Sequence, residues 1–442
     1  MNRDILRLAL PSIVSNITVP LLGMVDVAIM GHIGNELYIA AIAVGSMVFN
    51  VIYWILGFLR AGTSGLTAQA YGRATTDEAL AEAAGRATLP ILRQSLVIGL
   101  VMGLLIVVLQ LPLRHVALWL MGPEADVTAL VTPYYNTCVW GAPAVLGLFS
   151  LTGWFIGMQD TRTPMWIAIG QNIVNILVST LLVFNFHMGI VGVAIGTLTA
   201  QWLAFLVALM KVYRTSSYEV RGARSVSRAG RTSREALWEF FRVNRDLFLR
   251  TVLLVSVLLF FTSAGARQGA MMLAVNTLLM QLFTIFSYFM DGFAYAGEAL
   301  TGRYYGAGDR IAEHAVVRDL FRWGWAMVAV FTLLYWIGGQ PFLSLLTSDG
   351  NVVSDAAAYR FWYVLIPLCG MAAFVWDGIF VGITESRGLL VSCAVATVAF
   401  YSLWWSLQSA WGNDALWLAF LVFLLLRGTV QTYIYVRRTK LA

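Results

Sequence analysis

Residues 8–31 of the chain, LALPSIVSNITVPLLGMVDVAIMG, contain a single charged residue, Asp26. A stretch of this composition and length is typical of a membrane-spanning helix, because about 20 apolar residues cross the hydrocarbon core of a bilayer. Comparable runs follow at residues 38–60, 88–110, 127–156, 164–185, 190–212, 246–265, 270–297, 321–340, 356–382, 388–408 and 414–435. All twelve runs are predicted to be helices, because a helix satisfies its own backbone hydrogen bonds inside lipid.

The composition of the whole chain agrees with this pattern. Hydrophobic residues make up 59% of the 442 residues and charged residues only 12%, whereas soluble domains are about a quarter charged. The sequence therefore predicts an all-α polytopic membrane protein surrounded by the lipid bilayer. The net charge of +6 does not indicate nucleic-acid binding, because the Arg and Lys residues lie between the apolar runs.

The basic residues are concentrated in alternate loops. If the N-terminus is cytoplasmic, the cytoplasmic side includes a basic block from Lys211 to Arg250, whereas the opposite side holds only Arg114, Arg267 and Arg360. Cytoplasmic loops of membrane proteins carry such an excess of positive charge. We therefore expect both termini to be cytoplasmic, in the inner membrane of a bacterium.

Motifs of the first half of the chain recur in the second half in the same order. They are NRDIL at residues 2–6 and NRDLF at 244–248, LTAQAYG at 66–72 and LTGRYYG at 300–306, and GMQDTR at 157–162 and GITESR at 382–387. Each half contains six predicted spans, so both copies cross the membrane in the same direction and form a parallel internal repeat.

The repeat predicts three parts. These are an N-terminal six-helix lobe at residues 1–212, a cytoplasmic basic linker at 213–245, and a C-terminal six-helix lobe at 246–442. Transporters built from two such halves expose a central site alternately to each side by moving one half against the other. The predicted architecture is therefore that of a transporter.

Asp26 is the candidate residue for proton coupling. It lies within the first predicted span, and no basic residue neighbours it in the sequence. Ionisable residues inside membrane spans are costly and usually functional. Burial without a cation favours the neutral form of a carboxyl group, so this group can alternate between protonated and ionised forms. The alternative is a structural aspartate that binds a helix end or a water molecule.

A stripe of polar side chains lies on the fifth span. Asn172, Asn175 and Ser179 are spaced so that they share one helical face, and Thr197 of the next span is a candidate neighbour. Such a stripe faces protein or water rather than lipid. It predicts either a polar network that takes part in transport or hydrogen bonds that hold helices together.

The second half holds three further acidic residues within spans. Asp291 and Glu298 are seven residues apart on one face of the eighth span, and Asp377 lies on the tenth. These carboxylates are candidates for binding Na⁺ or a cationic substrate. They are equally candidates for structural ion pairs with Arg60 or Arg427.

Enzymatic activity is not expected. The sequence Gly62-Thr63-Ser64-Gly65 matches the GxSG motif of intramembrane serine proteases, but all four histidines lie at or beyond the ends of the spans. There is no P-loop, and therefore no sign of direct ATP use. The cysteines show no paired spacing, so we expect neither a disulfide nor a metal site; they are Cys138, Cys369 and Cys393.

Several motifs together resemble the multidrug and toxic compound extrusion (MATE) family, and within it the DNA-damage-inducible F subfamily. The motifs are Asp26 in its first-helix setting, Gln69-x-x-Gly72, Asn172-x-x-Asn175-Ile, and Asp291-Gly-Phe-Ala-Tyr-Ala-x-Glu298-Ala. The similarity extends from Leu8 to about Tyr435. It implies a twelve-helix, two-lobe antiporter that exports drugs or metabolites in exchange for H⁺ or Na⁺.

The resemblance also implies roles for individual residues. The aspartate that matches Asp26 is the protonation site in the family, and the asparagine that matches Asn175 belongs to its polar network. Family members often have Asn-Ile-x-x-Asp where this chain has Asn175-Ile-Leu-Val-Ser179. Ser179 does not titrate near neutral pH, so Asp26 is expected to act alone in the first lobe.

The sequence as a whole predicts a monomeric efflux antiporter for lipophilic, often cationic, small molecules. The expected coupling ion is H⁺, with Na⁺ as the alternative, and no cofactor is expected. A flippase for lipid-linked precursors is the alternative within transport. Flippases of this kind use several arginines that face the cavity to bind pyrophosphate, and only Arg60 and Arg427 are expected to be available for this.

Overall fold

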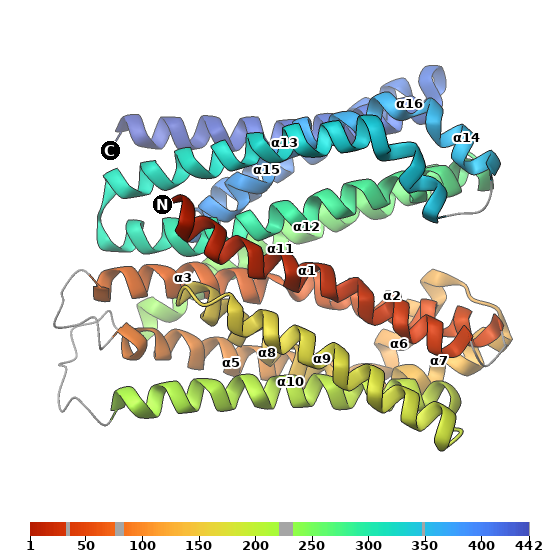
Figure 1. The fold of residues 1–442 in the computed structure, drawn as a ribbon, viewed down its shortest axis with the longest axis horizontal. Coiled ribbons are helices and arrows are strands. Elements are labelled where there is room, and N and C mark those ends of the chain that lie inside the picture. Colours follow the sequence, from red (N-terminus) through yellow and green to blue (C-terminus); the bar gives the residue numbers. More distant parts are fainter. Residues whose placement is uncertain (32–35, 76–83, 221–232, 347–349, 442) are drawn as a thin grey trace. The chain divides into compact units, whose positions relative to one another are not determined.

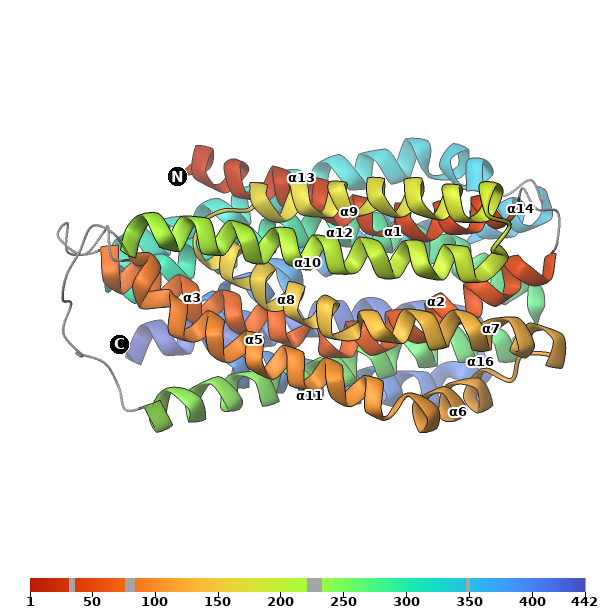
Figure 2. The same ribbon diagram turned by 90° about the horizontal axis from the view of Figure 1, so that it is seen from below.

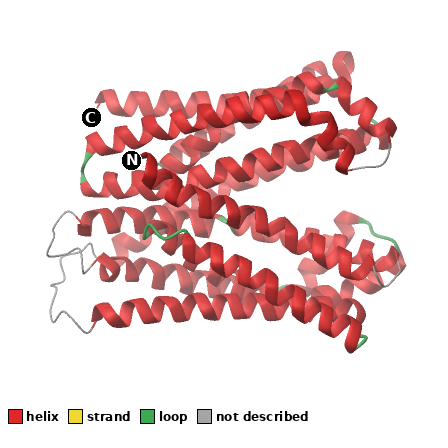
Figure 3. Ribbon diagram, viewed as in Figure 1, coloured by secondary structure: helices red, strands yellow, loops and turns green. Residues whose placement is uncertain are grey.

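A computed structural model describes residues 1–31, 36–75, 84–220, 233–346 and 350–441. Over these ranges the chain consists of helices and short connections, without strands (Figure 3). The first half contains α1 (Asn2–Gly31), α2 (Glu36–Leu56), α3 (Phe58–Thr75), α5 (Ala84–Val108), α6 (Gln110–Met121), α7 (Ala125–Cys138), η1 (Val139–Gly141), α8 (Ala142–Gly157), α9 (Arg162–Thr180), η2 (Leu181–Asn185) and α10 (Gly189–Val220). The second contains α11 (Ser233–Arg267), α12 (Ala270–Ala307), α13 (Arg310–Leu346), α14 (Gly350–Ala358), α15 (Arg360–Gly382) and α16 (Ser386–Leu441).

The predicted all-α membrane fold is confirmed. Eleven candidate spans occur in the described part of the chain, and the last of them, Ser386–Lys440, is bent at Gly412. The backbone of Gly412 is not helical, with φ 51° and ψ −123°. The bend falls between the predicted runs 388–408 and 414–435, so this one long element comprises two of the twelve predicted spans.

Several helices extend beyond the predicted apolar runs. After the run predicted at 38–60, the chain remains helical up to Thr75, the end of α3. Helix α11 begins at Ser233, inside the range 213–245 that was predicted as a linker. Hydropathy marks only the part of a helix that crosses lipid, whereas the helix itself continues for as long as its backbone hydrogen bonds do. The predicted linker residues 221–232 lie outside the described residues.

The chain divides into two compact units. The N-terminal unit contains Val14–Phe240 and Gly306–Gly308, and the C-terminal unit contains Met1–Ile13, Phe241–Tyr305 and Asp309–Ala442. The first turns of α1 belong to the C-terminal unit because Gly292 of α12 allows them to approach. A Cβ atom at Gly292 would lie 3.0 Å from the carbonyl oxygen of Ala9.

Each unit has its own helix packing. In the N-terminal unit α3, α5 and α8 pack against one another, and α10 packs against α7, α8 and α9. Figures 1 and 2 both show α9 and α10 running side by side. In the C-terminal unit α15 packs against α13 and α16.

Equivalent close contacts in the two units confirm the internal repeat. Gly157 of α8 packs against Thr67 of α3, and Gly382 of α15 packs against Thr301 of α12. Gly157 and Gly382 are 225 residues apart, and Thr67 and Thr301 are 234 apart, as the repeated sequence motifs are. A glycine in each copy therefore allows the same two helices to approach closely.

The turns that follow these glycines also match. Gln159 has φ 65° and Thr384 has φ 54°, which is a left-handed conformation uncommon for residues other than glycine. In both turns the next residue donates its N–H to a carbonyl at the end of the preceding helix. These hydrogen bonds join Asp160 to Phe155 (2.9 Å) and Glu385 to Phe380 (2.8 Å). Such a bond ends a helix by satisfying a carbonyl group that has no partner within the helix.

We expect Gly157→Ala to destabilise the protein by about 1–3 kcal/mol, because overpacking a tight contact costs about this much. The added Cβ would lie 2.6 Å from Thr67 Cβ and 2.7 Å from the carbonyl oxygen of Ser64. The apparent melting temperature of the purified protein in detergent measures the effect. Gly338→Ala in α13 is the control, because nothing lies within 4 Å of its Cβ position. Equal melting temperatures of the two variants would contradict the close contact.

Candidate functional site

A buried polar site in the N-terminal unit contains the candidate proton-coupling residue. Asp26 of α1 is only 3% exposed. The Thr197 hydroxyl of α10 donates to Asp26 Oδ2 at 3.5 Å, and Asn175 Nδ2 of α9 donates to Thr197 Oγ1 at 2.9 Å. Three helices therefore meet at one carboxylate, and we call Asp26, Asn175 and Thr197 the Asp26 site.

A small residue on α10 positions this site. A Cβ atom at Gly196 would collide with the Ser179 hydroxyl and lie 2.9 Å from the Ser179 amide nitrogen. Glycine therefore allows α10 to approach α9 at the level of Ser179. Thr197 is the next residue of α10, and this close approach places its hydroxyl within reach of Asn175.

The other two residues of the predicted polar stripe are placed differently. Asn172 donates through Nδ2 to the carbonyl oxygen of Thr18 at 2.6 Å, so it links α9 to an earlier part of α1. Ser179 is fully buried beside Gly196. The structure thus brings Asp26, Asn175 and Thr197 into one hydrogen-bonded group, with Ser179 one helical turn away on α9.

The Asp26 site has unused hydrogen-bonding capacity. Asp26 Oδ1, Asn175 Oδ1 and Ser179 Oγ are buried and have no hydrogen-bond partner in the described part of the chain. An ionised carboxylate only accepts hydrogen bonds, whereas a protonated one also donates. The amide and the hydroxyls around Asp26 can pair with either form.

No basic residue pairs with Asp26 in the ranges that the structure describes. Tyr134 and Cys138 of α7 interact electrostatically with the carboxylate, and Tyr134 is within 3.3 Å of the Ser46 hydroxyl. Sequence reasoning did not find these two neighbours. Both lie on α7, more than 100 residues after Asp26, and no local sequence pattern links that helix to α1.

The second-half acid Asp377 has a different environment. Asp377 Oδ2 of α15 accepts hydrogen bonds from Arg250 of α11 and from Arg427 Nη2 of α16, the latter at 2.5 Å. Asp377 Oδ1 accepts from Gln431 Nε2 at 2.8 Å. We call Arg250, Asp377, Arg427 and Gln431 the Asp377 cluster. Arg250 lies within the predicted run 246–265 and within the candidate span Phe240–Arg267.

The two remaining acidic candidates lie on α12 and are not partners of Asp377. Glu298 is buried and Asp291 is partly exposed. The backbone carbonyl of Glu298 lies beside Gly382, at the contact between α12 and α15. Within the described ranges, no group of three His, Cys, Asp or Glu residues is arranged to hold a metal ion.

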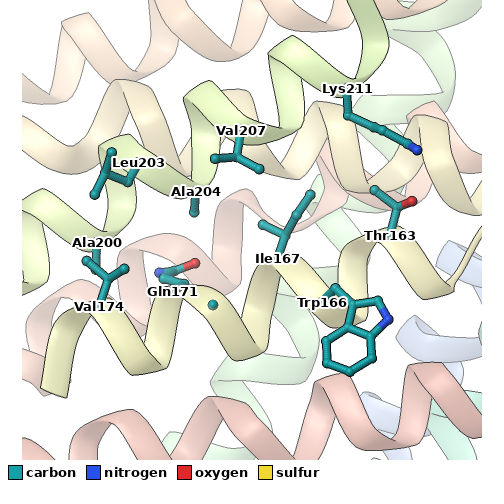
Figure 4. A pocket seen from close by; sticks show the side chains of 11 residues that line it. Thr163, Trp166, Ile167, Gln171, Val174, Ala200, Leu203, Ala204, Val207 and Lys211 are labelled. Carbon is teal, nitrogen blue, oxygen red and sulfur yellow. The ribbon is translucent and has the colours of Figure 1, made fainter. Parts of the chain in front are cut away.

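The N-terminal unit also contains a pocket of about 400 Å³ between α9 and α10, separate from the Asp26 site (Figure 4). Its walls are mainly apolar, and polar groups come from Thr163, Gln171 and Lys211. The complete lining is Thr163, Trp166, Ile167, Gly170, Gln171, Val174, Ala200, Leu203, Ala204, Val207 and Lys211.

The second half has an aromatic residue at the position that matches Asn175. The residue 225 positions after Asn175 is Phe400. Phe400 is fully buried and contacts the rings of Phe260 and Phe423. Where the N-terminal unit has hydrogen-bonding groups, the C-terminal unit therefore has aromatic packing.

Comparison with known proteins decides the family. The MatE family model matches the chain in both halves, at residues 11–181 and 247–403. The chain belongs to the MATE family of transporters. This confirms the resemblance found in the sequence, and the two matched segments correspond to the two copies of the internal repeat.

Individual MATE relatives cover most of the chain. DNA damage-inducible protein F of Escherichia coli (strain K12) is 37% identical over 423 residues, which are 96% of this chain and 89% of the relative. Probable multidrug resistance protein NorM of Thermotoga maritima is 22% identical over 364 residues, or 80% of this chain and 74% of the relative. The chain is therefore similar to proteins of the multidrug efflux class.

Solved MATE structures share the fold. The outward-facing conformation of a multidrug resistance MATE family transporter of the MOP superfamily has a TM-score of 0.85 at 18% identity, covering 99% of this chain and 95% of that one. A MATE protein in the bent conformation has a TM-score of 0.83 at 19% identity, covering 98% and 94%.

Membership of the MATE family excludes the protease interpretation, because the members of this family are transporters. The structure gives the GxSG match a packing role. Ser64 and Thr63 are buried in α3, where Thr63 Oγ1 lies 2.5 Å from the Ser95 hydroxyl. The carbonyl oxygen of Ser64 lies against Gly157, at the repeated contact between α3 and α8.

Proposed function

We propose that this MATE transporter is a proton-coupled antiporter that exports lipophilic, often cationic, small molecules by alternating access. The observation that carries the proposal is the setting of Asp26. Its carboxylate is buried, has no basic partner in the described ranges, and is bordered by groups that can donate or accept hydrogen bonds. A carboxyl group in such a setting can gain and lose a proton without losing its hydrogen bonds.

The proposed coupling is a competition for Asp26. A protonated Asp26 is neutral and compatible with a buried, apolar surrounding. A cationic substrate near the N-terminal unit favours the ionised form, so its arrival releases the proton. Reprotonation from the side of higher proton concentration then displaces the substrate, and repetition of these steps links inward proton movement to export.

The positive charge of the two arginines beside Asp377 supports H⁺ rather than Na⁺ as the coupling ion. Na⁺ requires several oxygen ligands and a carboxylate that is free to bind it. Both oxygens of Asp377 already accept hydrogen bonds, and two guanidinium groups stand beside them. A sodium ion would be repelled by these two cations.

We further propose that the protein acts as a monomer in a bacterial inner membrane, with both termini cytoplasmic. The distribution of Arg and Lys over the loops supports this orientation. The similarity to a protein of Escherichia coli supports the bacterial setting.

Proton release on substrate binding tests the proposed function. Purified protein in weakly buffered detergent is mixed with ethidium, a lipophilic cation, and a pH indicator reports released protons. We expect the wild type to release protons on binding and Asp26→Asn to release none, because the amide carries no titratable proton. The control is Asp355→Asn in α14, where the side chain is exposed. Release from Asp26→Asn equal to that of the wild type would refute the assignment.

A further inference from the structure

The Asp377 cluster has more positive than negative charge. It contains the guanidinium groups of Arg250 and Arg427 and one carboxylate, that of Asp377. Asp377 is the only acidic partner of either arginine in the described part of the chain. The cluster therefore carries one uncompensated positive charge inside the C-terminal unit, within predicted membrane spans.

Hydrogen-bond donors of the cluster are also unused. A guanidinium has five N–H donors and no acceptor. Arg250 and Arg427 each use one Nη2 group on Asp377 Oδ2, while their Nε atoms are buried and have no hydrogen-bond partner among the described residues. Both oxygens of Asp377 are occupied, so the aspartate does not satisfy these donors.

The surroundings supply no second anion. The ring of Phe423 lies 5.5 Å from the Arg427 guanidinium carbon, and the thiol of Cys393 donates to the carbonyl oxygen of Arg250 at 3.7 Å. An aromatic face attracts a cation but does not neutralise it. A buried, unpaired charge is costly, so an acceptor with a negative charge would be bound favourably here.

We propose that the Asp377 cluster binds the carboxylate group of an exported organic compound. A carboxylate matches the planar fork of a guanidinium and can accept two parallel hydrogen bonds from it. It would neutralise the excess positive charge of the cluster. The site is within reach of a ligand, because the side chains of Arg250 and Asp377 are 16% and 15% exposed, while Arg427 forms its buried side at 5%. The role in export rests on the proposed function, whereas binding itself does not.

The assignment extends the expected substrate class. Asp26 in the N-terminal unit suits a positive charge, and the Asp377 cluster in the C-terminal unit suits a negative one. The inference is therefore that the protein accepts compounds with a carboxylate in addition to lipophilic cations.

A matched pair of dyes tests the proposal. Rhodamine 110 has a free carboxylate, and rhodamine 123 is its methyl ester, so the two dyes differ at this group alone. Fluorescence polarisation gives their affinities for the purified wild type in detergent at neutral pH, without any ion gradient. We expect the acid to bind about tenfold more tightly than the ester, as one charge-assisted bidentate contact would produce. Equal affinities, or tighter binding of the ester, would overturn the proposal.

Two variants assign the preference to the cluster. Arg250→Gln leaves one arginine paired with one aspartate, so the preference for the acid should disappear. The double variant Arg250→Gln with Asp377→Asn has Arg427 alone and regains one excess positive charge, so the preference should return. A preference that persists in Arg250→Gln would place the carboxylate elsewhere. If that variant is not monodisperse, Arg250→Lys retains the charge and should retain the preference, and its loss there would contradict a charge-based site.

The outcome is independent of proton coupling. Asp26 is intact in all these proteins, and binding is measured at equilibrium. A dye preference without proton release would reject the proposed coupling only, and proton release without a dye preference would reject the carboxylate site only.

Discussion

We expect Asp26→Asn to abolish proton-driven export, while the protein still folds and inserts into the membrane. Asparagine has nearly the shape of a protonated aspartate and can still pair with the Thr197 hydroxyl, which lies 3.5 Å from Asp26 Oδ2. It cannot ionise, so a cycle that requires release of a proton stops. The measurement is dye export from proteoliposomes under an imposed pH gradient, and the rate should fall to that of liposomes without protein.

Ser179→Ala is the matched control for this variant. Ser179 lies one turn from Asn175 on α9, is fully buried, and its hydroxyl has no hydrogen-bond partner in the described part of the chain. A hydroxyl carries no exchangeable charge near neutral pH, so this variant should retain substantial transport. Its complete inactivity would show that the whole polar stripe, rather than the carboxyl group, is required.

A sodium gradient at equal pH on both sides separates the two coupling ions. We expect no dye export under this condition in the wild type. Robust export that survives in Asp26→Asn but is lost in Asp377→Asn would reverse the assignment and identify a sodium-driven transporter.

Asp377→Ala should cause the largest loss of stability among single substitutions in the C-terminal unit. Removing one partner of a buried ion pair costs about 3–5 kcal/mol, because the remaining charge stays buried without compensation. Here two arginines would lose the only anionic partner that they have among the described residues, and Arg427 is buried. The apparent melting temperature in detergent should fall by roughly ten degrees.

Two comparisons isolate the cause of this loss. Asp355→Ala, at an exposed position of α14, should leave the melting temperature nearly unchanged. Arg250→Gln combined with Asp377→Asn should be less damaging than Asp377→Ala, because it removes one cation together with the anion and retains a hydrogen-bonding side chain. A melting temperature of Asp377→Ala close to that of the wild type would show that the two arginines are compensated in another way.

The helices could be predicted from the sequence because hydrophobic run length reports directly on lipid contact. The same signal fails where a helix continues beyond its apolar run, as α3 does up to Thr75 and as α11 does before residue 246, from Ser233. The repeat was visible because the turns after α8 and α15 require similar residues at equivalent positions. Sequence patterns did not indicate that Gly157 and Gly382 make the same contact, because that contact joins distant helices.

The Asp26 site could be predicted in part. The spacing of Asn175 and Ser179 places both on one face of α9, and Asp26 is conspicuous as a charge inside an apolar run. The hydrogen bond between Asn175 and Thr197 depends on the close approach of α10 to α9 at Gly196. The spacing of polar residues along one helix does not show how closely another helix approaches it. Arg250 was grouped with the cytoplasmic basic residues because positive charge near a span end usually lies on that side, although it falls within the predicted run 246–265. Its partner Asp377 is 127 residues away, and no local pattern connects the two.

Phe400 stands at the position that matches Asn175, so the two halves of this protein are not interchangeable. Both halves have the same close contacts between helices, but their buried polar groups differ. The first half contains Asp26 with Asn175 and Thr197, and the second half contains Asp377 with two arginines. A chain assembled from two first halves would duplicate Asp26 and lack Arg250 and Arg427, so we expect it to lose the preference for a carboxylate that is proposed above.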